Sequence, residues 1–222
     1  MVHPCLTNIV ALFYTSLCWR CSANIKSITD KIDEYSPEEF ERCHQLYILK
    51  KKKNSYDVLH NFQDAFSVTI FCIILANVLM CSAITGSFLV KNLGEFPISL
   101  QMDFLYYLTS GFSCVVVTLW IAGRVPIEMN RFKNSFYQKV HERLLHHHAV
   151  IGLEELHLKT DLFNEPDFVL TGCNILPLKR STIIALVGTL FTYTVLVMNT
   201  NVSKDVCTIA NNTRSNICLN SL

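Results

Sequence analysis

The sequence predicts an all-α protein built as a bundle of membrane-spanning helices. Half of its 222 residues are hydrophobic and only 17% are charged, and the apolar residues gather in long runs instead of recurring at the period of a surface helix or strand. Gly (7) and Pro (6) are scarce, which disfavours a turn-rich β architecture. The formal net charge of +1 excludes reading the whole chain as a nucleic-acid binder or a disordered tail.

Three stretches of the chain contain no Asp, Glu, Lys or Arg, and each is at least 20 residues long. A helix of about 20 apolar residues crosses the hydrocarbon core of a bilayer. A shorter apolar segment near the start of the chain is a fourth candidate, and its alternative interpretation is a secretory signal peptide. We predict membrane spans at residues 5–19, 65–90, 104–123 and 181–200.

The Lys and Arg residues predict how these spans are oriented. Cytoplasmic loops carry an excess of Lys and Arg, and the four segments that follow the spans hold 8, 1, 8 and 2 of them. This alternation places the loops at 20–64 and 124–180 in the cytoplasm, and the loop at 91–103 and the tail at 201–222 outside the cell. Cleavage of the first segment would reverse the arrangement, so we favour four spans in the plasma membrane.

The tail carries two further features that suit an extracellular location. Glycosylation sequons begin at Asn201 and Asn211, and such sites are used only on the non-cytoplasmic side of the membrane. Cys207 and Cys218 lie in the same tail, where the compartment permits a disulfide. We predict a glycoprotein and leave the disulfide and the free-thiol alternatives open.

Catalytic and metal-binding patterns give little support to an enzyme. His141 and the run from His146 to His148 suggest a metal site, but consecutive histidines point to different faces of a helix, so we expect a solvated polar face. The chain has no Gly-rich phosphate loop, nucleophile elbow or His-Glu-x-x-His motif. We therefore expect no enzymatic activity, cofactor or metal. Asn77, inside a charge-free span, is expected to hydrogen-bond a neighbouring helix, with a ligand contact as the alternative.

Both long loops contain helical patterns. The sequence Ser-Pro-Glu-Glu at 36–39 predicts a helix start with Pro in the first turn and acids at the positive end of the dipole. An apolar residue every fourth position indicates one buried helix face. Such stripes occur at Val58, Phe62 and Phe66, and again at Phe132, Phe136, Val140 and Leu144, with Arg131, Lys133, Lys139 and Arg143 on the other faces.

The last span carries a stripe of small and polar residues on an otherwise bulky helix. Its members alternate steps of four and three along the chain, at Ser181, Ala185, Gly188, Thr192, Val195 and Asn199. One interpretation is close packing against another helix, as in small-xxx-small motifs. The other is a pore wall, in which hydroxyl-bearing residues from several copies surround water or ions.

A resemblance bears on this choice. The run from Phe168 to Ser181, followed by Gly188 and Thr192-Tyr193, resembles the C-terminal region of the arthropod gustatory receptors. That family ends its seventh helix with Thr-Tyr, five mostly apolar residues and Gln-Phe. This chain has Thr192-Tyr193 at the matching spacing and Asn199-Thr200 in place of Gln-Phe.

The resemblance implies a taste receptor that is a ligand-gated cation channel. Members of the family have seven spans, a cytoplasmic N-terminus and an extracellular C-terminus, and they assemble as tetramers whose seventh helices line the pore. The four spans here would correspond to spans four to seven, so the chain resembles the C-terminal half of a receptor and is expected to be partial. Expected partners are a small-molecule tastant, the bilayer, and identical or related receptor subunits.

The resemblance also assigns roles to residues. The segment from Phe168 to Arg180 would be the cytoplasmic half of the seventh helix, with Phe168, Lys179 and Arg180 in an anchor that joins subunits. The pore or gate residues would be Ser181, Ala185, Gly188, Thr192, Tyr193, Val195, Asn199 and Thr200. Alternative functions are an odorant receptor, a transporter fragment and a structural membrane protein.

Overall fold

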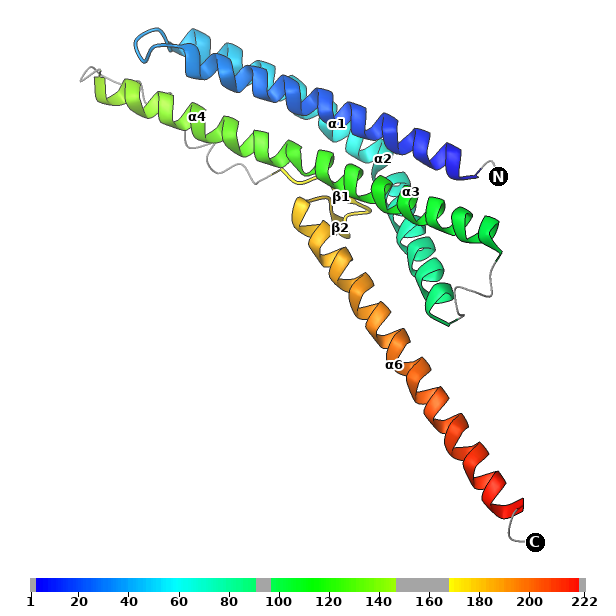
Figure 1. Cartoon of the computed structure of the whole chain (residues 1–222). Coiled ribbons are helices and arrows are strands. Elements are labelled where there is room, and N and C mark those ends of the chain that lie inside the picture. The colour runs from blue at the N-terminus through cyan, green and yellow to red at the C-terminus, as the bar shows by residue number, and fades with distance from the viewer. Residues whose placement is uncertain (1–2, 91–96, 147–167, 220–222) are drawn as a thin grey trace. The chain divides into compact units, whose positions relative to one another are not determined.

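A computed structural model describes residues 3–90, 97–146 and 168–219, with side chains at 7–89, 97–145 and 168–200. The described chain is almost entirely helical, which confirms the all-α class (Figure 1). One two-stranded hairpin interrupts the helices. The elements are α1 (His3–Glu34), α2 (Arg42–Val90), α3 (Ile98–Ala122), α4 (Arg124–His146), β1 (Thr171–Gly172), β2 (Leu176–Pro177) and α6 (Arg180–Leu219).

The chain divides into two compact units. The first contains residues Met1–Ile73 and Val116–Thr182, and the second contains Ile74–Val115 and Ile183–Leu222. The hairpin and all of α1 and α4 therefore belong to the first unit, most of α3 and α6 belongs to the second, and α2 is divided between them.

In the first unit, α1 packs against α4. The face that the sequence predicts on α4 is correct for Phe132, Phe136 and Val140, which are buried, and Leu144 is half-buried. The facing helix α1 buries its own isoleucines at the matching helical spacing. They are Ile25, Ile28 and Ile32.

The turn between α1 and α2 corrects one prediction. Residues 36–39 form a turn rather than the start of a helix, and α2 begins at Arg42. Ser36 and Glu39 still make the reciprocal contacts of a capping box, with each backbone N–H donating to the other's side chain at 3.4 and 3.3 Å. After this turn Phe40 is fully buried and contacts Phe136 of α4, with ring centroids 5.5 Å apart.

The stripe predicted on the first half of α2 is partly correct. Phe62 stacks on Tyr14 of α1 at 4.9 Å, and Phe66 meets Phe13 at 5.9 Å. Val58, in contrast, is 58% exposed, and the buried residue of that turn is Leu59. The α1–α2 contact sets this rotation of α2, and a four-residue repeat cannot distinguish two adjacent faces of a helix.

In the second unit, α2 packs closely on α3. Asn77 Nδ2 donates to Cys114 Sγ at 4.0 Å, so the predicted hydrogen bond of Asn77 to a neighbouring helix is confirmed. Gly111 of α3 lies at this contact, since a Cβ there would lie 2.7 Å from Met80 Cε and 3.1 Å from Asn77 Oδ1. Small and weakly polar groups thus bring these helices together, as they do in membrane interiors.

Three helical segments of the described chain are long and apolar enough to cross a membrane. They are Arg42–Leu89, Ile98–Leu145 and Arg180–Thr200, and they contain almost all of the predicted spans at 65–90, 104–123 and 181–200. The remaining predicted span, at 5–19, lies within α1, which is not among these three. The number of spans and their orientation remain predictions.

We expect Phe136→Ala to destabilise the α1–α4 contact by about 3–5 kcal/mol, because it empties a fully buried ring site. Thermal unfolding of the purified chain in detergent should show a melting temperature lower by about 10 °C. Tyr137→Ala, at the exposed neighbouring position, is the control and should change the melting temperature little. Equal shifts for the two variants would contradict the packing of α4 described here.

Candidate functional site

The described part of α6 has an unusual surface for an apolar helix. Only 6% of its apolar window is buried within the chain. Ile184 is 76% exposed and Phe191 is 70% exposed. An apolar helix left open in this way requires lipid or another protein surface around it.

The predicted stripe lies together on one exposed face of α6. Ser181, Ala185, Gly188, Thr192, Val195 and Asn199 are all exposed. The half-buried positions follow the same helical spacing on the opposite side, since each residue advances about 100° around the axis. These positions are Ile183, Leu186, Leu190, Thr194 and Val197.

The stripe is therefore not used for packing within the described chain. A Cβ added at Gly188 would meet no atom within 4 Å. A shallow hollow of about 560 Å³ runs along the outer half of the helix, lined by Phe191, Thr192, Val195, Leu196, Asn199 and Thr200. All of its lining residues belong to α6, so this hollow is open helix surface and not an enclosed ligand cavity.

Threonine hydroxyls on α6 bond to their own helix. Thr192 Oγ1 donates to the carbonyl of Gly188 at 2.9 Å, and Thr200 Oγ1 donates to that of Val197 at 2.9 Å. A hydroxyl that donates inward keeps oxygen lone pairs for an outside partner. The stripe can therefore present oxygen dipoles to water or a cation without leaving an unsatisfied donor.

Tyr193 lies off this face, although the resemblance groups it with the pore residues. Its hydroxyl is 2.8 Å from where a Cβ would stand on Gly86 of α2. Gly86 is buried, and Tyr193 is 37% exposed. Tyr193 therefore attaches α6 to α2 inside the second unit, while Thr192, one residue earlier, faces outward.

The segment before α6 contradicts the prediction that Phe168 to Arg180 is helical. It forms the β1–β2 hairpin, with Thr171 paired to Pro177 and Gly172 to Leu176. Pro177 lacks the N–H that a helix interior needs. The turn places Cys173 and Asn174 at φ 53° and 56°, a left-handed conformation that also excludes an α-helix.

Two polar residues of α2 hold this hairpin. Ser67 Oγ accepts a hydrogen bond from the backbone N–H of Cys173 at 2.7 Å and donates one to the carbonyl of Thr171 at 3.1 Å. Gln63 Nε2 donates to the hydroxyl of Thr171 at 3.0 Å. Sequence analysis did not single out Ser67 or Gln63, because their partners lie more than 100 residues away.

Two of the three predicted anchor residues contact other side chains of the first unit. Phe168 packs edge-on against Tyr56 at 5.3 Å. The Arg180 guanidinium lies 4.2 Å from the centre of the Trp120 ring, a cation–π contact. Lys179 is exposed. Their role in joining subunits remains a prediction.

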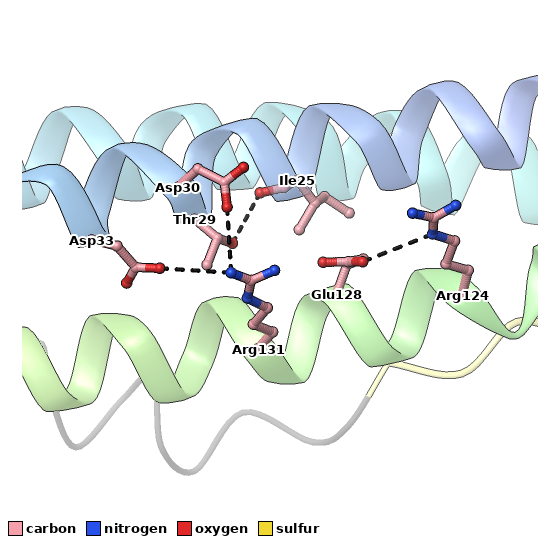
Figure 2. Close-up of polar contacts among 7 residues, drawn as sticks. All are labelled: Ile25, Thr29, Asp30, Asp33, Arg124, Glu128 and Arg131. Atoms are coloured by element: carbon pink, nitrogen blue, oxygen red, sulfur yellow. Dashed lines mark hydrogen bonds and ion pairs between the residues drawn. The ribbon is translucent and has the colours of Figure 1, made fainter.

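A charged seam joins α1 to α4 in the first unit (Figure 2). Arg131 lies 3.4 Å from Asp30 and 3.8 Å from Asp33, and all three side chains are about half exposed. Exposed pairs of this kind contribute about 0–1 kcal/mol, so the buried aromatic face of α4 holds the helices together more strongly.

Beside the seam lies a groove of about 490 Å³, whose charged lining residues are Lys26, Asp30, Lys31, Glu34 and Arg124. Arg124 stacks over Trp19 at 4.5 Å and lies 3.8 Å from Glu128. Because the groove carries both signs of charge, its electrostatics favour neither an anion nor a cation.

Cys18 and Cys21 of α1 form a Cys-x-x-Cys pair that the sequence interpretation overlooked. Cys18 is fully buried. Burial raises the pKa of the Cys21 thiol, which is the opposite of the lowered pKa found in reactive redox pairs. We interpret both as structural residues.

Within the described residues, no group of His, Cys, Asp and Glu could hold a metal ion. His141 is exposed and stacks on Tyr137 at 6.3 Å. The side chains of Asn201, Asn211, Cys207 and Cys218, and those of His146 to His148, lie outside the described set. Glycosylation and the disulfide therefore remain predictions.

Comparison of the chain with models of known protein families finds no match, and comparison with curated proteins finds no relative. The relation to gustatory receptors therefore rests on the short sequence resemblance.

Substitutions at two glycines test whether the start of α6 is tightly packed and whether its stripe is open. A Cβ on Gly123 would lie 2.9 Å from the backbone nitrogen of Arg180, whereas one on Gly188 meets nothing. We expect Gly123→Ala to lower stability by about 1–3 kcal/mol through overpacking. Gly188→Ala should raise it by up to about 1 kcal/mol through helix propensity. Thermal unfolding of both variants measures the difference, and shifts of the same sign would contradict this contrast.

Proposed function

We propose that this chain is a receptor subunit of an oligomeric, ligand-gated cation channel of the gustatory type, located in the plasma membrane, with α6 as its channel wall. The observation that carries the proposal is the stripe of small and hydroxyl-bearing residues on α6, all of whose members are exposed. The short sequence resemblance supplies the receptor class, its role in taste signalling and its ligand, a small molecule.

The residues beside the stripe suit a wall helix placed between other helices. Ile184 and Phe191 lie on one side of it and Leu196 on the other, and all three are more than half exposed. In an oligomer these apolar flanks would contact neighbouring subunits or lipid, and the polar stripe would face the central axis. A helix surrounded only by lipid has no use for an ordered polar face, because hydrocarbon offers its oxygens no partner.

Close packing between subunits is the second candidate role for the stripe. The open space at Gly188 supports it, because a glycine on a helix surface permits close approach of another membrane helix. The two roles differ in whether water reaches the stripe.

Cysteine substitution distinguishes these roles. In cells that lack other receptors, we would record basal cation currents and currents evoked by sucrose, fructose, caffeine and quinine, before and after a charged thiol reagent. Thr192→Cys and Asn199→Cys should lose current to roughly a tenth after treatment, because a charged group in a pore blocks permeation.

Phe191→Cys and Met198→Cys are controls at the same depths, at exposed positions beside the stripe, and should keep their current. The unsubstituted protein gives the background from native cysteines. A packing role predicts that reagent leaves every variant unchanged, and that result would contradict the proposed channel wall.

Glycosylation tests the proposed orientation, in which the C-terminus is extracellular. Asn201→Gln and Asn211→Gln should each remove one glycan from protein expressed in animal cells, seen as a mobility shift that glycosidase treatment abolishes. Ser203→Thr keeps the first sequon and should retain its glycan. A native chain that reaches the cell surface without glycan at either site would contradict the proposed location of the tail.

A further inference from the structure

Ser67 uses its hydroxyl group both as an acceptor and as a donor toward the hairpin. It accepts from the Cys173 N–H at 2.7 Å and donates to the Thr171 carbonyl at 3.1 Å. A hydroxyl offers one donor and two acceptor sites, so a single side chain of α2 joins two backbone groups of the hairpin. Removing it would leave a partly buried N–H and a partly buried carbonyl without this partner, which costs more than the bonds themselves contribute.

The hairpin also fits α2 sterically. Gln63, Ser67 and Phe71 lie four residues apart on α2, and all three contact the hairpin. A Cβ on Gly172 would lie 3.2 Å from Phe71 Cβ, closer than most Cβ contacts, so a side chain at position 172 would push the hairpin away from α2. The hairpin cannot slide along α2 without losing both the fit and the hydrogen bonds.

The turn is held in a conformation that side-chain-bearing residues adopt infrequently. Cys173 and Asn174 both have positive φ, and Asn tolerates this region better than Cys does. Asn174 accepts a hydrogen bond from Thr171 Oγ1 at 3.1 Å. The bond from Cys173 N to Ser67 therefore helps to hold a residue type that does not favour the turn by itself.

A rigid connection joins the hairpin to the first turn of α6. Only two residues separate β2 from α6. Leu178 N donates to the Leu170 carbonyl at 2.8 Å, and Thr182 Oγ1 donates to the Pro177 carbonyl at 2.7 Å. Both ends of this connection are thus bonded to the hairpin, which leaves no free linker.

We propose that Ser67 is a positioning residue that couples α2 to α6 through the hairpin, so that a movement of α2 turns the stripe of α6. The inference rests on the proposed channel wall, whose regulation it describes. Ser67 contacts neither the stripe nor a ligand, and it acts only through the hairpin.

The test compares three variants in the full chain carrying Thr192→Cys, in membranes. Ser67→Ala removes the hydroxyl, and Ser67→Thr retains it. Ser87→Ala is the matched control, because Ser87 lies on the same helix and its hydroxyl bonds only the Ala83 carbonyl of that helix at 2.9 Å. Two quantities are measured by mass spectrometry: hydrogen exchange of the amides at 170–182, and the rate at which the introduced thiol at position 192 reacts with a maleimide.

We expect Ser67→Ala to raise hydrogen exchange at 170–182 by about tenfold, since two hydrogen bonds of ordinary strength are lost. The thiol rate at position 192 should change as well, because a turn of α6 alters the surroundings of the stripe. Ser67→Thr and Ser87→Ala should match the parent. Position 192 lies twelve residues beyond the start of α6, about 18 Å along a helix, so a purely local role for Ser67 would leave its thiol rate unchanged.

Unchanged hydrogen exchange in Ser67→Ala would contradict the claim that Ser67 holds the hairpin. Faster exchange with an unchanged thiol rate would overturn the coupling. Neither amide exchange nor thiol modification requires ion conduction, so both rates test this inference even if the protein is not a channel. Current block by the stripe cysteines judges the proposed function separately.

Discussion

The whole structure depends on the fact that an α-helix satisfies its own backbone hydrogen bonds. Because of this, α6 can leave nearly all of its apolar window uncovered by the rest of the chain without exposing unpaired peptide groups to hydrocarbon. Its threonine hydroxyls are also satisfied within the helix, since Thr189, Thr192 and Thr194 each donate to the carbonyl four residues earlier. A polar face can then exist on a helix that is otherwise suited to lipid.

The hydroxyl group serves two different purposes in the two units. In the second unit, Thr192 donates into its own helix and leaves its oxygen facing outward. In the first unit, Ser67 uses its donor and an acceptor site at once, on a hairpin more than 100 residues away in sequence. The first arrangement leaves an oxygen on the surface of α6, and the second holds the hairpin that precedes α6 in the chain.

Much of the fold could be predicted from the sequence, because charge-free runs and four-residue repeats are local signals. The runs gave the apolar parts of α2, α3 and α6, and the repeat of Phe132, Phe136 and Val140 gave the buried face of α4. Local signals failed where the outcome depends on a distant partner. The contacts of Phe62 and Phe66 with α1 go with a rotation of α2 that buries Leu59 instead of Val58. The Ser36–Glu39 pattern leads into a turn, after which Phe40 is buried against Phe136 of α4.

The candidate site also has a part that local sequence signals predict and a part that depends on distant partners. The stripe on α6 was visible as a spacing, and the structure places it on one exposed face. The hairpin was not predicted: the resemblance implied a helix from Phe168 to Arg180, and no short window of sequence contains both Thr171 and Ser67. The Thr-Tyr motif groups two adjacent residues that lie on different faces of α6. Tyr193 approaches Gly86 of α2, whereas Thr192 is exposed.

None of the six residues that form the stripe on α6 has an ionisable side chain. A channel wall of this kind would act on ions through oxygen dipoles alone, without fixed charge. Its conductance would then follow the hydration energy of the ion more closely than its valence, and acidification of the medium would leave the wall itself unaltered. Any dependence of gating on pH would have to arise elsewhere in the chain or in a partner subunit.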